Sequence, residues 1–201
     1  MSEISLFEAI RSQRAIRRFR PDPVPQEAVE RILQAAIHAP SGGNAQPWSF
    51  VVIRDRGIKQ QLGVWYLDVW ENIYTKSTSV ATGAVYRSAE YLAHHFAESP
   101  LIILPCIKGT PDDKMTKGAS IYPAVQNMLL AALELGIGSV ITTFLQHHED
   151  KVKELLGIPD DIRMACAVPM GYPAEGERFG GARRRPLADV VHYDGWGNQQ
   201  A

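Results

Sequence analysis

One stretch in the first half of this chain is composed as a loop, and its sequence is Ala39-Pro40-Ser41-Gly42-Gly43-Asn44-Ala45-Gln46-Pro47-Trp48. An amphipathic run ends before it at His38 and a β-type apolar run, 49–53, follows, so the stretch turns a helix into a strand. Prolines stiffen its ends, glycines allow close approach of the backbone, and short polar side chains offer hydrogen bonds. This composition predicts a loop that contacts a polar ligand.

Length and composition indicate one globular domain. The chain has 201 residues, 45% of them apolar and 21% charged, which suffices for one full core but is short for two. We therefore expect a single domain over residues 1–201. The net charge of −1 argues against a nucleic-acid binder. Because no signal peptide and no run of roughly 18 apolar residues occurs, we expect a cytosolic protein that does not associate with membranes.

Cysteine and histidine spacing indicates no metal site. Cys106 and Cys166 lie far apart in apolar stretches, without CxxC or Cys/His spacing, and His94-His95 has no partner at metal-ligand spacing. Neither a zinc site nor a disulfide framework is predicted. Both cysteines are expected to be buried thiols.

Hydrophobic periodicity predicts alternating helices and strands. In the N-terminal half, helices are expected at 5–13, 26–38, 58–75 and 86–96, with Ser5 as a possible N-cap and Leu6, Ala9 and Ile10 on one face of the first. The segment 76–83 is expected to be a loop. In the C-terminal half, we expect a strand buried on both faces at 100–107, a loop at 109–117, a mostly apolar helix at 119–135, a strand at 139–144, a short helix at 146–156 and a strand at 163–170. A strand-like run at 189–193 lies in an apolar tail that should pack on the domain or on a partner subunit.

Two groups of residues have open interpretations. Arginines cluster near both ends of the chain, at Arg11, Arg14, Arg17, Arg18 and Arg20 and at Arg183, Arg184 and Arg185. Each cluster is either a solvated face or part of a site where both converge on one small anion. The aromatic residues of 58–75 are either core or, for Trp65, Trp70 and Tyr74, a wall beside a planar ligand in a substrate pocket.

Four segments resemble the FMN-dependent nitroreductase family, in the family's order. They are Arg14-Ala15-Ile16-Arg17-Arg18-Phe19; the 39–48 loop with its strand; Gln126-Asn127-Met128-Leu129-Leu130-Ala131-Ala132 running into Gly136-Ile137-Gly138; and Gly171-Tyr172-Pro173 with Arg183-Arg184-Arg185-Pro186-Leu187. The resemblance implies an α+β fold, a three-layer sandwich with a central, mainly antiparallel sheet flanked by helices. It also implies a homodimer with FMN at the interface and a C-terminal segment that extends onto the partner subunit.

The resemblance further implies where the cofactor binds. Arg14 and the C-terminal arginines would hold the FMN phosphate, and Arg17 would lie near the pyrimidine edge of the flavin. The 39–48 loop would contact the partner's flavin, and the backbone around Thr142 and Thr143 would face N5. The full set of implied cofactor-binding residues is Arg14, Ala15, Arg17, Pro40, Ser41, Gly42, Asn44, Gln46, Thr142, Thr143, Arg183, Arg184 and Arg185.

By the same resemblance, the expected activity is hydride transfer from NAD(P)H through flavin N5 to a nitroaromatic or quinone, by a ping-pong mechanism. No catalytic side chain is expected, because the flavin carries the chemistry. Gln13 and Ala15 stand where the family often has Arg and Ser, and Gly42 replaces a frequent Ser. The region 57–117 matches nothing transferable. The alternatives are a flavin store or redox sensor with little turnover, and a reductive dehalogenase or flavin-fragmenting enzyme of the same fold.

Overall fold

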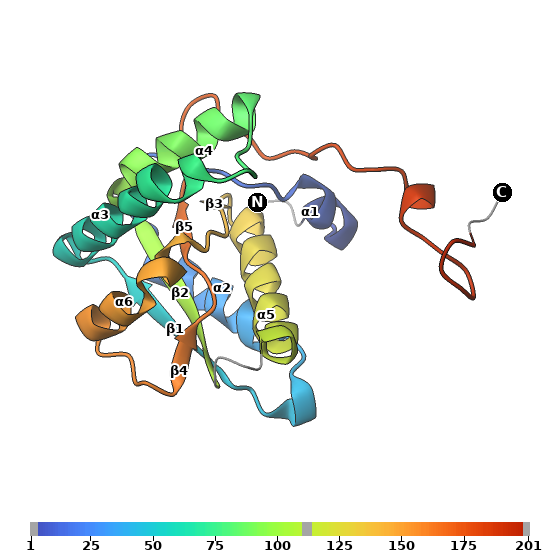
Figure 1. Ribbon diagram of the computed structural model, residues 1–201, viewed down its shortest axis with the longest axis horizontal. Coiled ribbons are helices and arrows are strands. Elements are labelled where there is room, and N and C mark those ends of the chain that lie inside the picture. The colour runs from blue at the N-terminus through green and yellow to red at the C-terminus, as the bar shows by residue number, and fades with distance from the viewer. Residues whose placement is uncertain (1–3, 110–113, 199–201) are drawn as a thin grey trace.

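A computed structural model describes residues 4–109 and 114–198 of the chain (Figure 1). In these residues five strands form one sheet, in which β1, β2, β5 and β3 are neighbours in that order and β4 also pairs with β2. Every strand pair is antiparallel. The strands are β1 (Trp48–Ile53), β2 (Leu101–Lys108), β3 (Gly138–Ser139), β4 (Ile162–Met164) and β5 (Val168–Gly171).

Helices cover both faces of the sheet (Figure 1). On one face lie α2 (Gln26–Ile37) and α5 (Lys114–Glu134), and on the other lie α3 (Arg56–Asn72), α4 (Gly83–His95) and α6 (Glu149–Leu156). The central strand β2 serves both cores, because Leu101 and Ile103 pack toward one and Ile102 and Leu104 toward the other. The expected three-layer α+β sandwich and the doubly buried strand are confirmed.

The first helix, α1 (Leu6–Ser12), begins where it was expected, but the face that it buries differs from the expected one. Ser5 caps it, since the Ser5 hydroxyl accepts a hydrogen bond from the Glu8 N–H at 3.3 Å. The buried residues are Ala9 and Ser12, whereas Leu6, Phe7 and Ile10 are exposed by 65%, 84% and 53%. An apolar helix face of this kind is therefore left uncovered by the single chain.

The strand expected at 163–170 is two strands with a bulge between them. Both pair with β2, where Cys106 faces Met164 and Ile103 faces Val168, so two residues of β2 lie between these pairs and three residues lie between them on the other side. Pro105 of β2 has no N–H to donate, which explains why the ladder breaks at this point. The bulge frees Ala167 to pair with Thr142, through two hydrogen bonds of 2.9 and 2.8 Å.

Three further expectations need correction. The strand at 139–144 is limited to Gly138–Ser139 and an isolated bridge at Thr142, because β-branched residues form a strand only where β5 offers a partner. The run 189–193 forms no strand and follows a short turn at Leu187–Asp189, since it lies beside no strand of the described chain. The helix α5 begins inside the loop expected at 109–117, of which 110–113 lie outside the described residues.

The expectation of buried thiols is confirmed. Cys106 and Cys166 are buried and free, and burial raises the pKa of Cys106 to about 11 and that of Cys166 to about 12. Throughout residues 4–109 and 114–198, no helix has the length and apolarity needed to cross a membrane.

The contact between α6 and β4 gives a stability prediction. The Glu149 carboxylate accepts hydrogen bonds from the Arg163 guanidinium at 2.6 to 3.0 Å and from the Met164 N–H at 2.8 Å. Burial opposes ionisation of Glu149, but these bonds outweigh it and lower the pKa of this carboxyl. We expect Glu149→Gln to reduce the free energy of unfolding by about 1–3 kcal/mol at neutral pH.

The effect should depend on pH with a defined sign. Because the pKa is lowered in the folded state, the contribution is full above the unfolded value of about 4.3 and is lost as pH falls through the folded value. Urea unfolding of wild type and Glu149→Gln at pH 7 and near pH 4 measures it, with Asp150→Asn on the exposed neighbour as control. A difference that stays constant between the two pH values contradicts the prediction.

Candidate functional site

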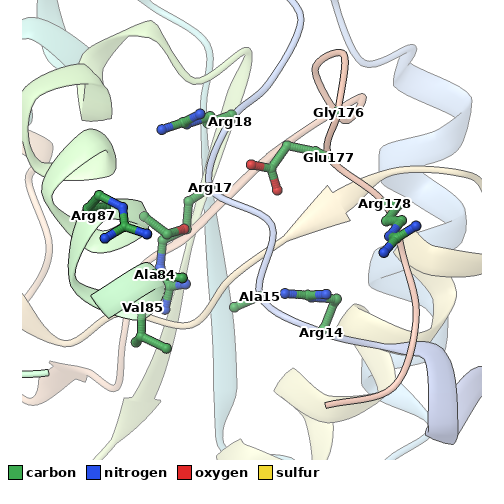
Figure 2. A pocket seen from close by; sticks show the side chains of 11 residues that line it. Arg14, Ala15, Arg17, Arg18, Ala84, Val85, Arg87, Gly176, Glu177 and Arg178 are labelled. Carbon is green, nitrogen blue, oxygen red and sulfur yellow. The ribbon is translucent and has the colours of Figure 1, made fainter. Parts of the chain in front are cut away.

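Five arginines line one cavity of about 320 Å³ between the segment after α1, the start of α4 and the chain after β5 (Figure 2). Arg14, Arg17 and Arg18 come from the first segment, Arg87 from α4 and Arg178 from the third. The other lining residues are Ala15, Ala84, Val85, Ser88, Gly176 and Glu177. We call this the basic pocket.

The sheet fixes the segment that carries three of these arginines. Ala15 forms a parallel bridge with Ser139, and the Ile16 N–H donates to the Ser139 carbonyl at 3.0 Å. Ile16 is fully buried, and a Cβ on Gly138 would lie only 2.7 Å from its side chain. Only glycine therefore lets β3 approach the segment so closely, and Arg14 and Arg17 flank this anchored point.

The guanidinium of Arg17 is half-buried beside two other functional groups. Burial lowers the pKa of Arg17, and the acidic groups of Tyr66 and Glu177 partly offset this. Tyr66 is buried, which raises its pKa to about 12, and its hydroxyl lies 2.8 Å from the hydroxyl of Thr142. The structure thus brings Thr142 and Arg17 together around the Tyr66 hydroxyl.

The basic pocket has an excess of positive charge without internal neutralisation. None of its five arginines forms an ion pair with a carboxylate in the described part of the chain, and Glu177 is the one acidic residue among its lining residues. Guanidinium groups in this arrangement bind phosphate or carboxylate through charge-assisted hydrogen bonds. The residues fit the phosphate group of a nucleotide cofactor.

The 39–48 loop lies at the other end of α5 from the basic pocket (Figure 1). The Gly42 N–H donates to the Ser120 hydroxyl at 3.4 Å, whereas the basic segment bridges to Ser139, beyond the end of α5. The helix from Ser120 to Glu134 is about 20 Å long, at about 1.5 Å per residue. The two predicted parts of the cofactor site therefore do not meet within one chain.

The loop holds a defined conformation although it is exposed. Gly43, Asn44 and Gln46 have φ values of 59°, 54° and 48°, which is uncommon for residues other than glycine. The Ser41 hydroxyl accepts from the Gln46 N–H at 3.0 Å, and the Gln46 amide donates to Asn44 Oδ1 at 3.3 Å. Pro40 precedes this turn and is exposed. The polar groups are thus prearranged at the surface.

Comparison with known proteins now identifies the family. The family model described as the nitroreductase family matches residues 10–172. The chain belongs to the nitroreductase family. It is 32% identical over 192 residues, covering 94% of this chain and 98% of the relative, to an Archaeoglobus fulgidus protein provisionally named NADH dehydrogenase/NAD(P)H nitroreductase. The predicted family is confirmed, and the family and this relative support an oxidoreductase enzyme.

Two other proteins show how far the likeness extends. The chain is 25% identical over 200 residues to iodotyrosine deiodinase 1 of Rattus norvegicus, covering 95% of this chain and 70% of that protein. The fold also matches a Desulfitobacterium hafniense nitroreductase solved with bound FMN, with a TM-score of 0.74, 22% identity, and coverage of 93% of this chain and 96% of that one. The predicted nitroreductase fold is thereby confirmed.

The C-terminal arginines of this nitroreductase-family chain do not reach the basic pocket. Arg183, Arg184 and Arg185 are exposed on a tail that runs past α1 and away from the domain (Figure 1). The tail was expected to pack either on its own domain or on a partner subunit, and packing on its own domain is not observed. Leu187 and Trp196 of the tail are exposed by 72% and 92%, so packing on a partner subunit stays a prediction.

The three aromatic residues named as a possible pocket wall pack against the core of the single chain, with Trp70 buried and Trp65 and Tyr74 half-buried. Trp70 is 2% exposed and stacks on Tyr74 with ring centroids 4.9 Å apart. The Tyr74 hydroxyl accepts from the Ala81 N–H at 2.8 Å, which fastens the following loop. Trp65 lies near His148, with ring centroids 6.3 Å apart. None of the three lines the basic pocket, and a role toward substrate stays a prediction for each.

Sequence reasoning missed several residues of the nitroreductase-family site. Arg87 and Tyr66 lie far from the recognised motifs, and Arg178 lies between Pro173 and Arg183 without belonging to either motif segment. Tyr66 reads as one more core aromatic in the sequence, and nothing in its pattern indicates the contact with Thr142. Arg18 belongs to the basic cluster seen in the sequence, but the wall of the pocket on which it lies is set by the packing of α4. Thr143, expected beside the cofactor, is exposed next to Thr142.

Proposed function

We propose that this protein is an FMN-dependent oxidoreductase that uses NAD(P)H to reduce a small electron-poor acceptor such as a nitroaromatic or a quinone. The observation that carries the proposal is the basic pocket, in which Arg14 and the half-buried Arg17 flank the point where the first segment is anchored to β3. Bound FMN supplies the hydride transfer between donor and acceptor.

The residues of the chain have separate tasks in this proposal. Arg14 and Arg178 are exposed at the rim of the pocket next to α1 and would donate hydrogen bonds to the phosphate. Arg17 is more buried, so its charge would be less screened and would stabilise an anionic ring next to it. Tyr66 orients the Thr142 hydroxyl at 2.8 Å and keeps the loop after β3 in place.

The proposal includes a homodimer, for which two features of the chain give support. The 39–48 loop is prearranged but about 20 Å from the basic pocket of its own chain. The uncovered apolar face of α1 and the exposed apolar residues of the tail provide surface that a second copy would bury. In the dimer, the loop of one subunit would complete the pocket of the other, and Arg183 to Arg185 would reach the partner.

A spectrum of the purified protein tests the proposal. We expect a yellow protein that binds FMN and loses its visible flavin absorbance when NADH or NADPH is added without oxygen. Recovery of the colour on adding a nitroaromatic or a quinone completes the cycle. A protein that takes up no FMN on titration contradicts the proposal, and bound flavin that neither donor reduces would favour a storage or sensing role.

Reductive dehalogenation is the second candidate. It is favoured by the relative named iodotyrosine deiodinase, which this chain matches over 95% of its own length. The chemically reduced holoprotein would be incubated with 3-iodotyrosine and the released iodide measured. Iodide release in proportion to protein would support this candidate, and its absence alongside rapid nitroaromatic reduction would exclude it.

A further inference from the structure

The basic pocket has arginines on two different walls. On the α1 wall lie Arg14 and Arg178; the chain just after Arg178 is held there, because the Gly180 N–H donates to the Ser12 carbonyl at 2.9 Å. On the α4 wall lie Arg87, a residue of α4, and Arg18, whose guanidinium carbon is 4.5 Å from the ring centroid of Tyr91. Figure 2 shows the Arg18 side chain extending toward the α4 side of the pocket, away from Arg14.

The two walls approach the basic pocket from different points of the chain. The segment from Arg14 to Arg18 is extended between its bridges to β3 and to Pro173, so the two α-carbons are about 13 Å apart at about 3.3 Å per residue. In Figure 2 the Arg18 side chain extends toward α4, whereas the Arg14 guanidinium lies beside Ala15. If Arg14 and Arg178 hold the cofactor phosphate, Arg18 and Arg87 are free for another anion.

The α4 wall has the features of a recognition surface. Arg18 stacks on Tyr91, which lies one helical turn beyond Arg87, so its guanidinium is held in place without an acidic partner; this holds for the residues the structure describes. Val85, which is 58% exposed, and Ala84 add apolar surface to the same wall. The negative charge of Glu177 acts on Arg17, which lies between the two walls.

We propose that Arg18 and Arg87 form a second anion subsite, which binds the anionic group of the substrate that reacts at the flavin. This inference rests on the proposed FMN function and names the substrate chemistry of that site: an apolar or aromatic body with a carboxylate or phosphate. Two guanidinium groups bind either anion with paired hydrogen bonds. The source of the anion is either the acceptor, as a carboxylate, or the nicotinamide donor, as its phosphates.

The test compares charged and uncharged substrates in the two half-reactions. The variants are Arg18→Gln and Arg87→Gln, with Arg87→Lys as the conservative change and Arg56→Gln, an exposed arginine outside the pocket, as the charge-matched control. The acceptors are 4-nitrobenzoate and nitrobenzene, and the donors are NADPH and the uncharged 1-benzyl-1,4-dihydronicotinamide. Each rate is followed by stopped flow on holoprotein with its bound FMN.

The expected result is a lower kcat/KM for one charged substrate only. Loss of a charge-assisted hydrogen bond should lower kcat/KM for that substrate about tenfold or more, with its uncharged analogue little changed and Arg87→Lys partly restored. A loss for 4-nitrobenzoate assigns the subsite to the acceptor, and a loss for NADPH assigns it to the donor. Equal effects on charged and uncharged substrates, no effect, or loss of FMN from the variants would overturn the inference. If wild-type protein binds no FMN, it is the proposed function that fails.

Discussion

Arg17→Ala is expected to weaken FMN binding by about 10–100-fold and to make the midpoint potential of the bound flavin about 30–60 mV more negative. A charge-assisted hydrogen bond contributes about 1.5–3 kcal/mol, which equals one to two factors of ten in affinity. For a two-electron couple, about 1.4 kcal/mol corresponds to 30 mV. Arg17 is half-buried next to Tyr66, so its charge is less screened than that of an exposed arginine.

The measurement is potentiometry on flavin-saturated protein, together with fluorescence titration of FMN. Arg17→Lys keeps the positive charge and should recover most of the potential but less of the affinity, because a lysine lacks the planar fork of donors. Arg14→Ala serves as the second comparison, since at the rim of the pocket it should affect affinity more than potential. An unchanged potential in saturated Arg17→Ala refutes the role assigned to this residue.

The parts of the site that depend on local chemistry were predictable from the sequence. The segment with Arg14 and Arg17 and the 39–48 loop are short stretches. Their charges, glycines and prolines indicate an anion site and a ligand-contacting turn without reference to the rest of the chain. The helices at 26–38 and 58–75 follow from apolar spacing and were found within three residues of their bounds. Buried Cys106 and the doubly buried β2 follow from an apolar run without alternation.

The parts that depend on pairing between distant segments were not predictable. Val140 to Thr143 have strand propensity, yet the strand stops at Ser139 because the partner strand is short and bulged. The bulge itself arises from Pro105 on the facing strand. Arg87 and Arg178 reach the basic pocket through the packing of α4 and of the chain after β5, and nothing in their own sequence neighbourhoods indicates an anion.

The shared character of the site gives the second large prediction. If the 39–48 loop completes the pocket of the partner, a defect in the pocket arginines and a defect in the loop can be placed on two different chains of one dimer. One chain carries Arg14→Ala and Arg17→Ala. The other carries Asn44→Ala and Gly43→Val; a β-branched residue disfavours the left-handed conformation at φ 59°, and a Cβ at this position would meet no atom within 4 Å. Each variant alone should form homodimers that retain little FMN, and Asn44→Ala alone should already lower flavin occupancy.

In the mixed dimer the two defects fall into one site. The pocket with altered arginines would face the altered loop, and the intact pocket would face the intact loop, so heterodimers isolated with two affinity tags should bind one FMN per dimer with near wild-type affinity. If each site instead lay within a single chain, both sites of the heterodimer would be damaged and it would bind none. Wild-type occupancy in the loop-variant homodimer would show that the loop does not contact the flavin. The stoichiometry of this one species therefore decides whether the distance between loop and pocket along α5 is bridged by a second subunit.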